Sequence, residues 1–285
     1  MNAIEVKGLC KKYKNYHSTW FKLENVDLIL PSGCIMGLIG ENGAGKSTTI
    51  KLILDIIGRD AGTVKILGED ASPLSDRIKN DIGVVLDEPC FPDSLTTDNI
   101  GKIMAKTYDN WNSEKFDELL ARFDIDPKKK FKALSKGMKI KLSIAVALSH
   151  SARLLILDEP TNGLDPVIRS EIIAIFNEFT RDPMKSVLIS SHIVSDLEKI
   201  CDYIAFMHKG KIILCAEKDR LLEWYGVIRC TADDLEKINP EAIVGKRESQ
   251  YGVEAVVERR AVPAEMEISS VSIEDLFVFI VKGEK

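Results

Sequence analysis

The sequence predicts an α/β fold built around a mostly parallel sheet, and two observations support this expectation. Short apolar runs of the kind that form buried parallel strands occur at 34–39, 154–157 and 187–190. Helix-like segments alternate with these runs along the chain, which is typical of an α/β sheet. The 285 residues are 45% apolar and 29% charged, as in an ordinary globular protein, and suffice for one large domain or two modest ones.

Charge, hydropathy and cysteine usage narrow the class of protein. The 39 Lys and Arg residues against 44 Asp and Glu give a formal net charge of -5, so the chain as a whole repels nucleic acid and no nucleic-acid partner is expected. The longest nearly uncharged stretch, 28–40, is well short of the roughly 20 residues that a spanning helix needs. Residues 1–9 mix acids and bases, so no signal peptide is expected. The six cysteines lack metal-site spacing and are expected to be free thiols in a reducing cytosol.

The first apolar run is followed by a glycine-rich loop with a phosphate-binding pattern. Residues 40–47 read Gly-Glu-Asn-Gly-Ala-Gly-Lys-Ser and match G-x-x-x-x-G-K-[ST] without a mismatch. Glycines let backbone N–H groups approach phosphate oxygens, and the helix expected at 47–57 directs its positive end at the same anion. Lys46 reaches the β- and γ-phosphates, and the Ser47 hydroxyl is offered to Mg²⁺. The nucleotide-binding residues expected here are Gly40, Asn42, Gly43, Gly45, Lys46, Ser47 and Thr48.

A phosphate loop by itself leaves GTPases, small-molecule kinases and motor or transport ATPases open. No N-K-x-D motif for reading a guanine base occurs in the chain. The second apolar run, 154–157, ends in Asp158 and Glu159, at the strand edge where ligands of open α/β sheets bind. Because side chains alternate along an extended chain, Asp158 is expected to serve Mg²⁺ while Glu159 addresses an attacking water.

Two further segments differ from the strand-rich regions. Residues 88–150 are expected to be mostly helical, with apolar residues at helical spacing between Phe116 and Phe123. Toward the end of the chain, alternating runs such as 253–258 precede an apolar, helix-like stretch at 273–281. The sequence therefore predicts a helical insertion and a small appended region.

Several short motifs occur in the order that one family shares. They are the phosphate loop at 40–47, Leu-Ser-Lys-Gly-Met at 134–138, Leu-Leu-Ile-Leu-Asp-Glu-Pro at 154–160, Thr-Asn-Gly-Leu-Asp-Pro at 161–166 and Ser-Ser-His at 190–192. Over roughly residues 1–220 the chain resembles the nucleotide-binding subunits of ATP-binding cassette (ABC) transporters. The form of its 134–138 motif resembles that of stand-alone exporter cassettes, the drug, antimicrobial-peptide and cell-envelope export group.

The resemblance implies a fold and a domain organisation. The fold would be that of a P-loop NTPase with a mostly parallel core sheet, an antiparallel β subdomain, a helical insertion and a small C-terminal α+β extension. Residues 1–87 and 151–216 would form the ATP-binding core, residues 88–150 the helical signature subdomain, and residues 217–285 the C-terminal extension.

The resemblance also assigns roles to residues at matching positions. His192 matches the switch histidine that contacts the γ-phosphate, and with Glu159 it makes up the expected catalytic pair. Ser135 and Gly137 lie in the signature motif, where the start of a helix offers backbone N–H groups to a γ-phosphate. Asp165 matches the D-loop residue that touches the opposite subunit. These last three residues join the nucleotide-binding set.

An aromatic ring that stacks on adenine is expected near the N-terminus. By family position it is Tyr13, and Tyr16 and Trp20 are alternatives because this stretch is slightly long. Stacking needs only a π-face, so a ring from any of the three positions would serve.

Two motifs depart from the family pattern. The signature is usually L-S-G-G-Q, and this chain has Lys136 and Met138 at the third and fifth positions. The family's Q-loop glutamine, which reaches Mg²⁺ or water, aligns with Asp87, and the adjacent Glu88 is an alternative. A carboxylate there still accepts from a metal-bound water but adds negative charge near the phosphates. The expected metal ligands are Ser47, Asp158 and Asp87.

The resemblance implies an ATP-hydrolysing transporter subunit. Two such subunits, a homodimer or a pair of paralogues, would associate head to tail around two Mg-ATP and drive a separate transmembrane permease. The chain would then be cytoplasmic and peripheral on the inner face of the membrane, with Phe91, Pro92 and Leu95 as candidate permease contacts. Export of a drug, peptide or envelope component is the main expectation. The alternatives are an importer subunit and an ABC ATPase that acts on the ribosome or DNA.

Overall fold

Three sheets organise the chain, of which the structure, a computed structural model, describes residues 1–14, 20–87, 91–250 and 252–283. The central sheet has six strands in the order β10-β9-β3-β8-β7-β6. Its strands are β3 (Ile35–Gly40), β6 (Ile82–Val85), β7 (Leu154–Asp158), β8 (Ser186–Ser191), β9 (Tyr203–His208) and β10 (Lys211–Glu217). All neighbours pair in parallel except β10, which is antiparallel to β9. The expectation of a mostly parallel core sheet is confirmed.

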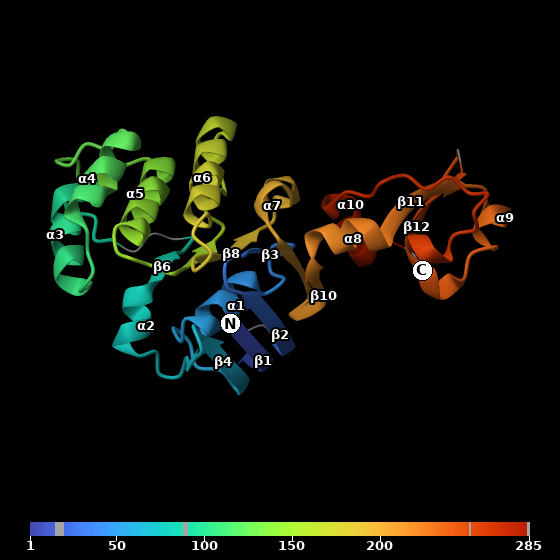
Figure 1. The fold of residues 1–285 in the computed structure, drawn as a ribbon, viewed down its shortest axis with the longest axis horizontal. Helices are drawn as coiled ribbons and strands as arrows, with labels where there is room; N and C mark the ends of the chain where they lie inside the picture. Colours follow the sequence, from blue (N-terminus) through green and yellow to red (C-terminus); the bar gives the residue numbers. More distant parts are fainter. Residues whose placement is uncertain (15–19, 88–90, 251, 284–285) are drawn as a thin grey trace.

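Burial on both faces explains why the apolar runs form strands. β3, β7 and β8 are buried at every position, as parallel strands covered by helices are. One face packs on α1 (Lys46–Ile53), while α6 (Pro166–Phe179) and α7 (Val194–Ile200) cover the other (Figure 1). The three strands expected from the sequence are therefore confirmed.

An antiparallel sheet lies against α1 on the side away from α6 (Figure 1). Its strand order is β2-β1-β4-β5. The strands are β1 (Asn2–Lys14), β2 (Trp20–Pro31), β4 (Ala61–Ile66) and β5 (Glu69–Asp70). Apolar side chains of this sheet, of α1 and of one face of the central sheet form a continuous core. The sheet therefore holds the helix that follows the phosphate loop.

The helix expected at 47–57 is shorter than the sequence suggested. α1 ends at Ile53, with Leu54 as its C-cap. Asp55 then adopts a left-handed backbone with φ of 53°, which a continuing right-handed helix does not allow. The prediction of a helix to residue 57 is therefore wrong by one turn.

Helices occupy most of the chain between β6 and β7, as expected. They are α3 (Thr97–Thr107), α4 (Ser113–Arg122), the 3₁₀ turn η1 (Phe131–Ala133) and α5 (Lys136–Leu148), and a short α2 (Asp76–Asp81) precedes β6. α4 begins where the Asn112 side chain accepts from the Lys115 N–H, and it buries Phe116, Leu119 and Leu120. These helices lie together at one end of the molecule (Figure 1). None of the helices in the described ranges is both long and apolar enough to cross a bilayer.

The last segment forms a small sheet with short helices at the opposite end of the molecule (Figure 1). The sheet order is β11-β13-β12. The elements are α8 (Lys218–Trp224), β11 (Tyr225–Cys230), α9 (Ala232–Leu235), η2 (Pro240–Ala242), β12 (Ile243–Ser249), β13 (Gly252–Glu258), η3 (Arg259–Ala261) and α10 (Ile273–Lys282). α10 packs against α7 and β9, with the rings of Phe277 and Phe206 5.2 Å apart. The Ile273 N–H donates to Oε1 of Glu198 in α7 at 3.3 Å.

Candidate nucleotide site

The glycine-rich loop joins β3 to α1 and requires glycine at specific positions. Gly45 has φ of 113°, a backbone conformation that side chains with a Cβ rarely adopt. A Cβ at Gly40 would lie 2.5 Å from the carbonyl oxygen of Met207, so only glycine allows this contact with β9. Lys46 donates from Nζ to the carbonyl oxygens of Gly40 and Glu41, at 2.7 and 3.3 Å. The lysine therefore lies across the inside of its own loop.

A cavity of about 320 Å³ opens beside this loop. Its lining brings together eight of the residues predicted for nucleotide, metal or catalysis with three that were not, and these are considered in turn below. The lining residues are Phe21, Glu41, Asn42, Gly43, Gly45, Lys46, Ser47, Thr48, Asp87, Glu159 and Asn162. The cavity thus lies at the carboxyl ends of the central strands, where an open α/β sheet binds its ligand.

Glu159 lies between two basic side chains on the wall of this cavity. Its Oε1 is 3.1 Å from Nζ of Lys46, and its Oε2 is 2.7 Å from Nδ1 of His192. A carboxylate only accepts, so Nδ1 of the histidine carries the proton in this contact. The Glu159 backbone is left-handed, with φ of 50°, and its N–H donates to Oγ of Ser190 at 3.0 Å. The local backbone therefore fixes the direction of the carboxylate.

The Asp158 side chain points toward Ser190 and not toward Lys46 and His192, as the alternation of side chains along the strand predicts. Its Oδ1 accepts from the Ser190 hydroxyl at 2.7 Å, and the residue is 2% exposed. Ser190 therefore connects the two neighbouring carboxyl residues, through its hydroxyl to Asp158 and through the Glu159 N–H. Asp158 is not part of the cavity lining, although it directly precedes Glu159, which is.

The oxygen donors at this place fit Mg²⁺. The Ser47 hydroxyl and the Asp87 carboxylate line the cavity, and Asp158 lies next to it. Within the described ranges no group of three or more His, Cys, Asp or Glu is placed to hold a metal ion. Mg²⁺ commonly keeps several waters and binds through one or two protein oxygens plus substrate phosphates, so a sparse oxygen set suits it.

The signature residues Ser135 and Gly137 and the D-loop residue Asp165 lie outside the cavity lining of the same chain. Ser135 caps α5, and its hydroxyl accepts from the Met138 N–H at 3.3 Å. Asp165 caps α6 and accepts from the Val167 and Ile168 N–H groups. A Cβ at Gly137 would lie 3.2 Å from Leu164, so these two helix starts are in contact.

The aromatic residue at the cavity is Phe21, which the sequence analysis did not single out. Tyr13 was expected to stack on adenine, but it does not line the cavity. It pairs with Phe21 across the β1–β2 hairpin, with ring centroids 6.4 Å apart. Tyr16 lies outside the described residues. The signal that was available is the alternation of Phe21 and Leu23 in the second strand, both of which approach Gly45.

Two further lining residues, Glu41 and Asn162, were also missed. Glu41 is a variable position of the glycine-rich motif, and Asn162 directly precedes the glycine of the D-loop motif. Asp87 lines the cavity as expected, while its alternative Glu88 lies outside the described residues. For Glu41 and Asn162, the only sequence feature that could have predicted a place at the cavity is their position within the two motifs.

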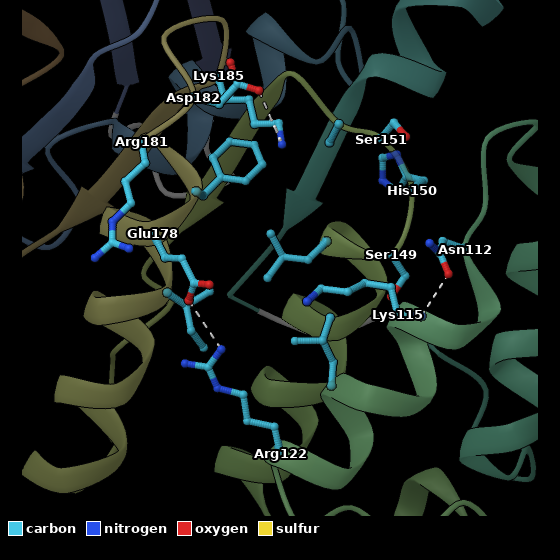
Figure 2. A pocket seen from close by; sticks show the side chains of 15 residues that line it. Asn112, Lys115, Arg122, Ser149, His150, Ser151, Glu178, Arg181, Asp182 and Lys185 are labelled. Carbon is cyan, nitrogen blue, oxygen red and sulfur yellow. Dashed lines mark hydrogen bonds and ion pairs between the residues drawn. The ribbon is translucent and has the colours of Figure 1, made fainter.

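A larger cavity, about 580 Å³, lies away from the phosphate loop, between α4, the turn after α5 and the end of α6 (Figure 2). The Arg122–Glu178 pair, 3.5 Å apart, spans it. Its lining contains none of the residues predicted for nucleotide. His150 at its edge stacks on Tyr108 at 4.0 Å, and its Nδ1 is 3.0 Å from the Asn80 carbonyl oxygen. Burial lowers the pKa of this histidine, which suits a neutral, structural imidazole.

Comparison with known proteins identifies the family. The family model "ABC transporter" matches residues 23–162. The bacitracin transport ATP-binding protein BcrA of Enterococcus faecalis is 34% identical over 74% of this chain and 68% of its own length. The lantibiotic transport ATP-binding protein SrtF of Streptococcus pyogenes is 38% identical over 69% of this chain and 85% of its own length.

A solved structure shares the fold. It is a dimeric, post-hydrolysis state of an ATP-binding cassette bound to ADP and phosphate, and it superposes with a TM-score of 0.68 at 22% identity, over 75% of this chain and 98% of its own. Together with the ordered motifs and the cavity at the phosphate loop, these matches show that the chain belongs to the ABC transporter family and is one of its ATP-binding, ATPase subunits.

Proposed function

We propose that this chain hydrolyses ATP as one of two cassettes that associate head to tail around two Mg-ATP and drive a separate membrane permease. The observation that carries the proposal is the position of the Glu159 carboxylate between Lys46 and His192 on the wall of the phosphate-loop cavity. A carboxylate held at the end of a strand beside a phosphate loop is placed to act on a water at the γ-phosphate.

The roles follow from these contacts. Lys46 leaves Glu159 to neutralise charge on the transferring phosphoryl group, and the freed carboxylate orients the attacking water and accepts its proton. His192 holds the far oxygen of that carboxylate and secures the γ-phosphate end. Mg²⁺, when bound, neutralises charge on the β- and γ-phosphate oxygens. Ser47, Asp158 and Asp87 would hold it and its waters.

The second copy supplies what the cavity of one chain lacks. Ser135, Gly137 and Asp165 lie together at the starts of α5 and α6 and do not line the cavity. In a head-to-tail pair these residues would cover the nucleotide held by the other copy. Backbone N–H groups at the start of α5 then meet the γ-phosphate. ATP binding closes the pair, and hydrolysis opens it.

The permease would dock in an apolar groove where the core meets the helical segment. The groove has a volume of about 450 Å³. It is lined by Leu54, Ile56, Leu74, Asp76, Lys79, Asn80, Ile82, Val84, Thr107 and Tyr108. Phe91, Pro92 and Leu95 were expected from the sequence as permease contacts; of these, Phe91 and Leu95 are partly buried against the helical core, with the rings of Phe91 and Phe131 5.6 Å apart. The exposed Ile56 is the better candidate for the contact.

The names of the relatives suggest the class of substrate that is transported. BcrA and SrtF are named for bacitracin and lantibiotic transport, so we propose export of a peptide, drug or envelope component. Residues 1–87 and 151–216 then act as the ATP-binding core, 88–150 as the signature subdomain and 217–285 as an extension. The chain would lie on the inner face of the membrane through its permease.

Glu159→Gln tests the catalytic proposal. The amide keeps the shape of the side chain but cannot accept the proton, so turnover should fall by about 10²-fold or more while ATP binding persists. Size-exclusion chromatography with Mg-ATP should then show a stable dimer. Wild-type turnover in this variant would contradict the proposal.

Ile56→Lys tests the docking groove. The charged side chain should abolish co-purification of a membrane protein, identified by mass spectrometry, from native membranes in mild detergent, with ATPase activity of the isolated chain intact. Ile29→Lys is the matched control, since Ile29 is an exposed isoleucine outside the groove. Equal recovery of the permease with both variants would refute this docking site.

A further inference from the structure

The nucleotide cavity holds more negative than positive side chains. Among the residues that the structure describes, its lining contains three carboxylates, those of Glu41, Asp87 and Glu159, and one basic residue, Lys46. Because ATP is itself strongly anionic, a closed site would carry a surplus of negative charge even with Mg²⁺ bound. A further cation near the phosphates would offset that surplus.

The carboxylates differ in how well they are already neutralised. Glu159 is 3.1 Å from Lys46. Glu41 has two neighbours, His208 at 3.5 Å and Lys282 of α10 at 3.9 Å. In the described part of the chain no basic side chain lies within ion-pair distance of Asp87. Asp87 is therefore the acid at this site that most lacks a counter-charge.

Lys136 is a cation that lacks a carboxylate partner among the described residues. It is the exposed first residue of α5, whose first turn contains no acid. The other lysines of this helix have neighbours, since Lys139 lies over the Phe131 ring at 4.7 Å and Lys141 is 2.9 Å from Glu171. No carboxylate of the described residues lies within ion-pair distance of Lys136. The helix start carries partial positive charge, so a lysine there is unfavourable in the isolated chain.

The side chain of Lys136 lies on the same face as the D-loop. Its Nζ would be 3.4 Å from a Cβ placed on Gly163. Gly163 follows Asn162, which lines the nucleotide cavity, and precedes the helix cap Asp165 by two residues. The ammonium group is thus already on the surface that the proposed dimer would bring to a second copy.

We propose that Lys136 provides a cation to the nucleotide site of the second copy, where it contacts the γ-phosphate and offsets the charge of Asp87. The inference rests on the proposed head-to-tail pair and deepens it. It also accounts for two departures from the family pattern together, because a neutral residue is replaced by a lysine at position 136 and a neutral glutamine by an acid at position 87. The two changes are opposite in charge, as side chains that meet across the dimer would require.

Dimer formation in the Glu159→Gln background tests the inference without depending on turnover. Mg-ATP would be titrated against this parent, and against versions that also carry Lys136→Met, Lys136→Arg, Asp87→Asn, or Asp87→Asn with Lys136→Met. The dimer fraction would be measured by analytical ultracentrifugation. Lys132→Met is the matched control, since Lys132 is an exposed lysine of the preceding turn that lies outside the cavity lining.

The expected result is weaker ATP-dependent dimerisation when the positive charge at position 136 is removed, by an amount that depends on Asp87. Lys136→Met should raise the ATP concentration for half-maximal dimer by about tenfold, while Lys136→Arg and Lys132→Met should leave it unchanged. The change that Asp87→Asn makes in that concentration should depend on position 136 and should be less favourable with Lys136 than with Lys136→Met, because the two charges interact. The melting temperature of the nucleotide-free Lys136→Met variant should not fall, since an unfavourable charge has been removed from the helix start.

Two outcomes would overturn the inference while leaving the proposed function intact. One is a parent that dimerises with Mg-ATP and a Lys136→Met variant that behaves like Lys132→Met. The other is an effect of Asp87→Asn that is the same in both backgrounds, which would show that the two side chains do not meet. A parent that binds Mg-ATP but never dimerises would instead refute the proposed head-to-tail function and this inference with it.

Discussion

Nδ1 of His192 lies 2.7 Å from Oε2 of Glu159, so the histidine directs the carboxylate that faces the phosphate loop. Replacing His192 with Ala should lower kcat by about 10²-fold, because the carboxylate loses its orientation. ATP affinity should fall much less than kcat, because His192 lies outside the cavity lining and would contact the nucleotide only at its γ-phosphate end. Steady-state kinetics and a nucleotide titration separate the two effects. The kcat of His192→Gln, which still donates a hydrogen bond, should lie between those of the wild type and His192→Ala. An unchanged kcat in His192→Ala would contradict this role.

Lys46 and Glu159 form an ion pair in which both side chains are buried, at 6% and 9% exposed. Lys46→Ala should abolish detectable ATP binding by calorimetry. It should also lower the free energy of unfolding by about 3 kcal/mol, because the buried Glu159 carboxylate loses its lysine counter-charge and keeps only its contact with His192. Urea denaturation of the double variant with Glu159→Gln should recover most of that loss. If the double variant is no more stable than Lys46→Ala, the buried charge is not the cause.

The lowered pKa of His150 predicts a loss of stability in acid. Burial holds the pKa of the folded-state imidazole below its ordinary value of 6.5, so the unfolded chain binds a proton that the folded chain does not. This contribution to stability is fully present above pH 6.5 and is lost as the pH falls through the folded-state pKa. Urea denaturation at about pH 7.5 and about pH 5.5 measures it.

His150→Phe isolates the part that belongs to this residue. The phenyl ring can keep the stacking on Tyr108 but cannot titrate. The variant should therefore lose less stability than the wild type over the same pH interval. An equal loss in both chains would assign the acid sensitivity to other groups.

The contact of Phe277 with Phe206 predicts that the last helix stabilises the ATP-binding core. Phe277 is 9% exposed, and Phe277→Ala should lower the free energy of unfolding by about 3 kcal/mol. Trp224→Ala is the aromatic control, since Trp224 is 47% exposed and its loss should change stability by less than about 0.5 kcal/mol. Denaturation monitored at both ends of the chain should remain one transition. Two separate transitions would show that the extension unfolds alone.

The parts of the site that the sequence could predict are those encoded by local pattern. The phosphate loop needs glycine at positions such as Gly45, where the backbone is left-handed, so its motif is readable without a structure. The carboxylate pair follows a strand that is apolar throughout, and parallel strands end at one edge of the sheet. Glu159 and Lys46 were therefore expected in one place, and the cavity contains both.

The parts that could not be predicted depend on pairing between distant segments. Phe21, and not its cross-strand partner Tyr13, borders the cavity because β2 approaches the phosphate loop at Gly45, a contact between segments that are distant in the sequence. The end of α1 was misjudged because Asp55 takes a left-handed conformation that its residue type does not dictate. The packing of α10 on α7 likewise arises from tertiary contacts, which neither helix encodes alone.

The strand order of the central sheet has a consequence for how the molecule opens. β3 has hydrogen-bonded neighbours on both sides, whereas β6, which leads into the helical segment, is the last strand of the order and pairs only with β7 in the described part of the chain. Amide protons of β6 should thus exchange with solvent sooner than those of β3. We therefore expect the helical segment that follows β6 to move more readily than the glycine loop that follows β3.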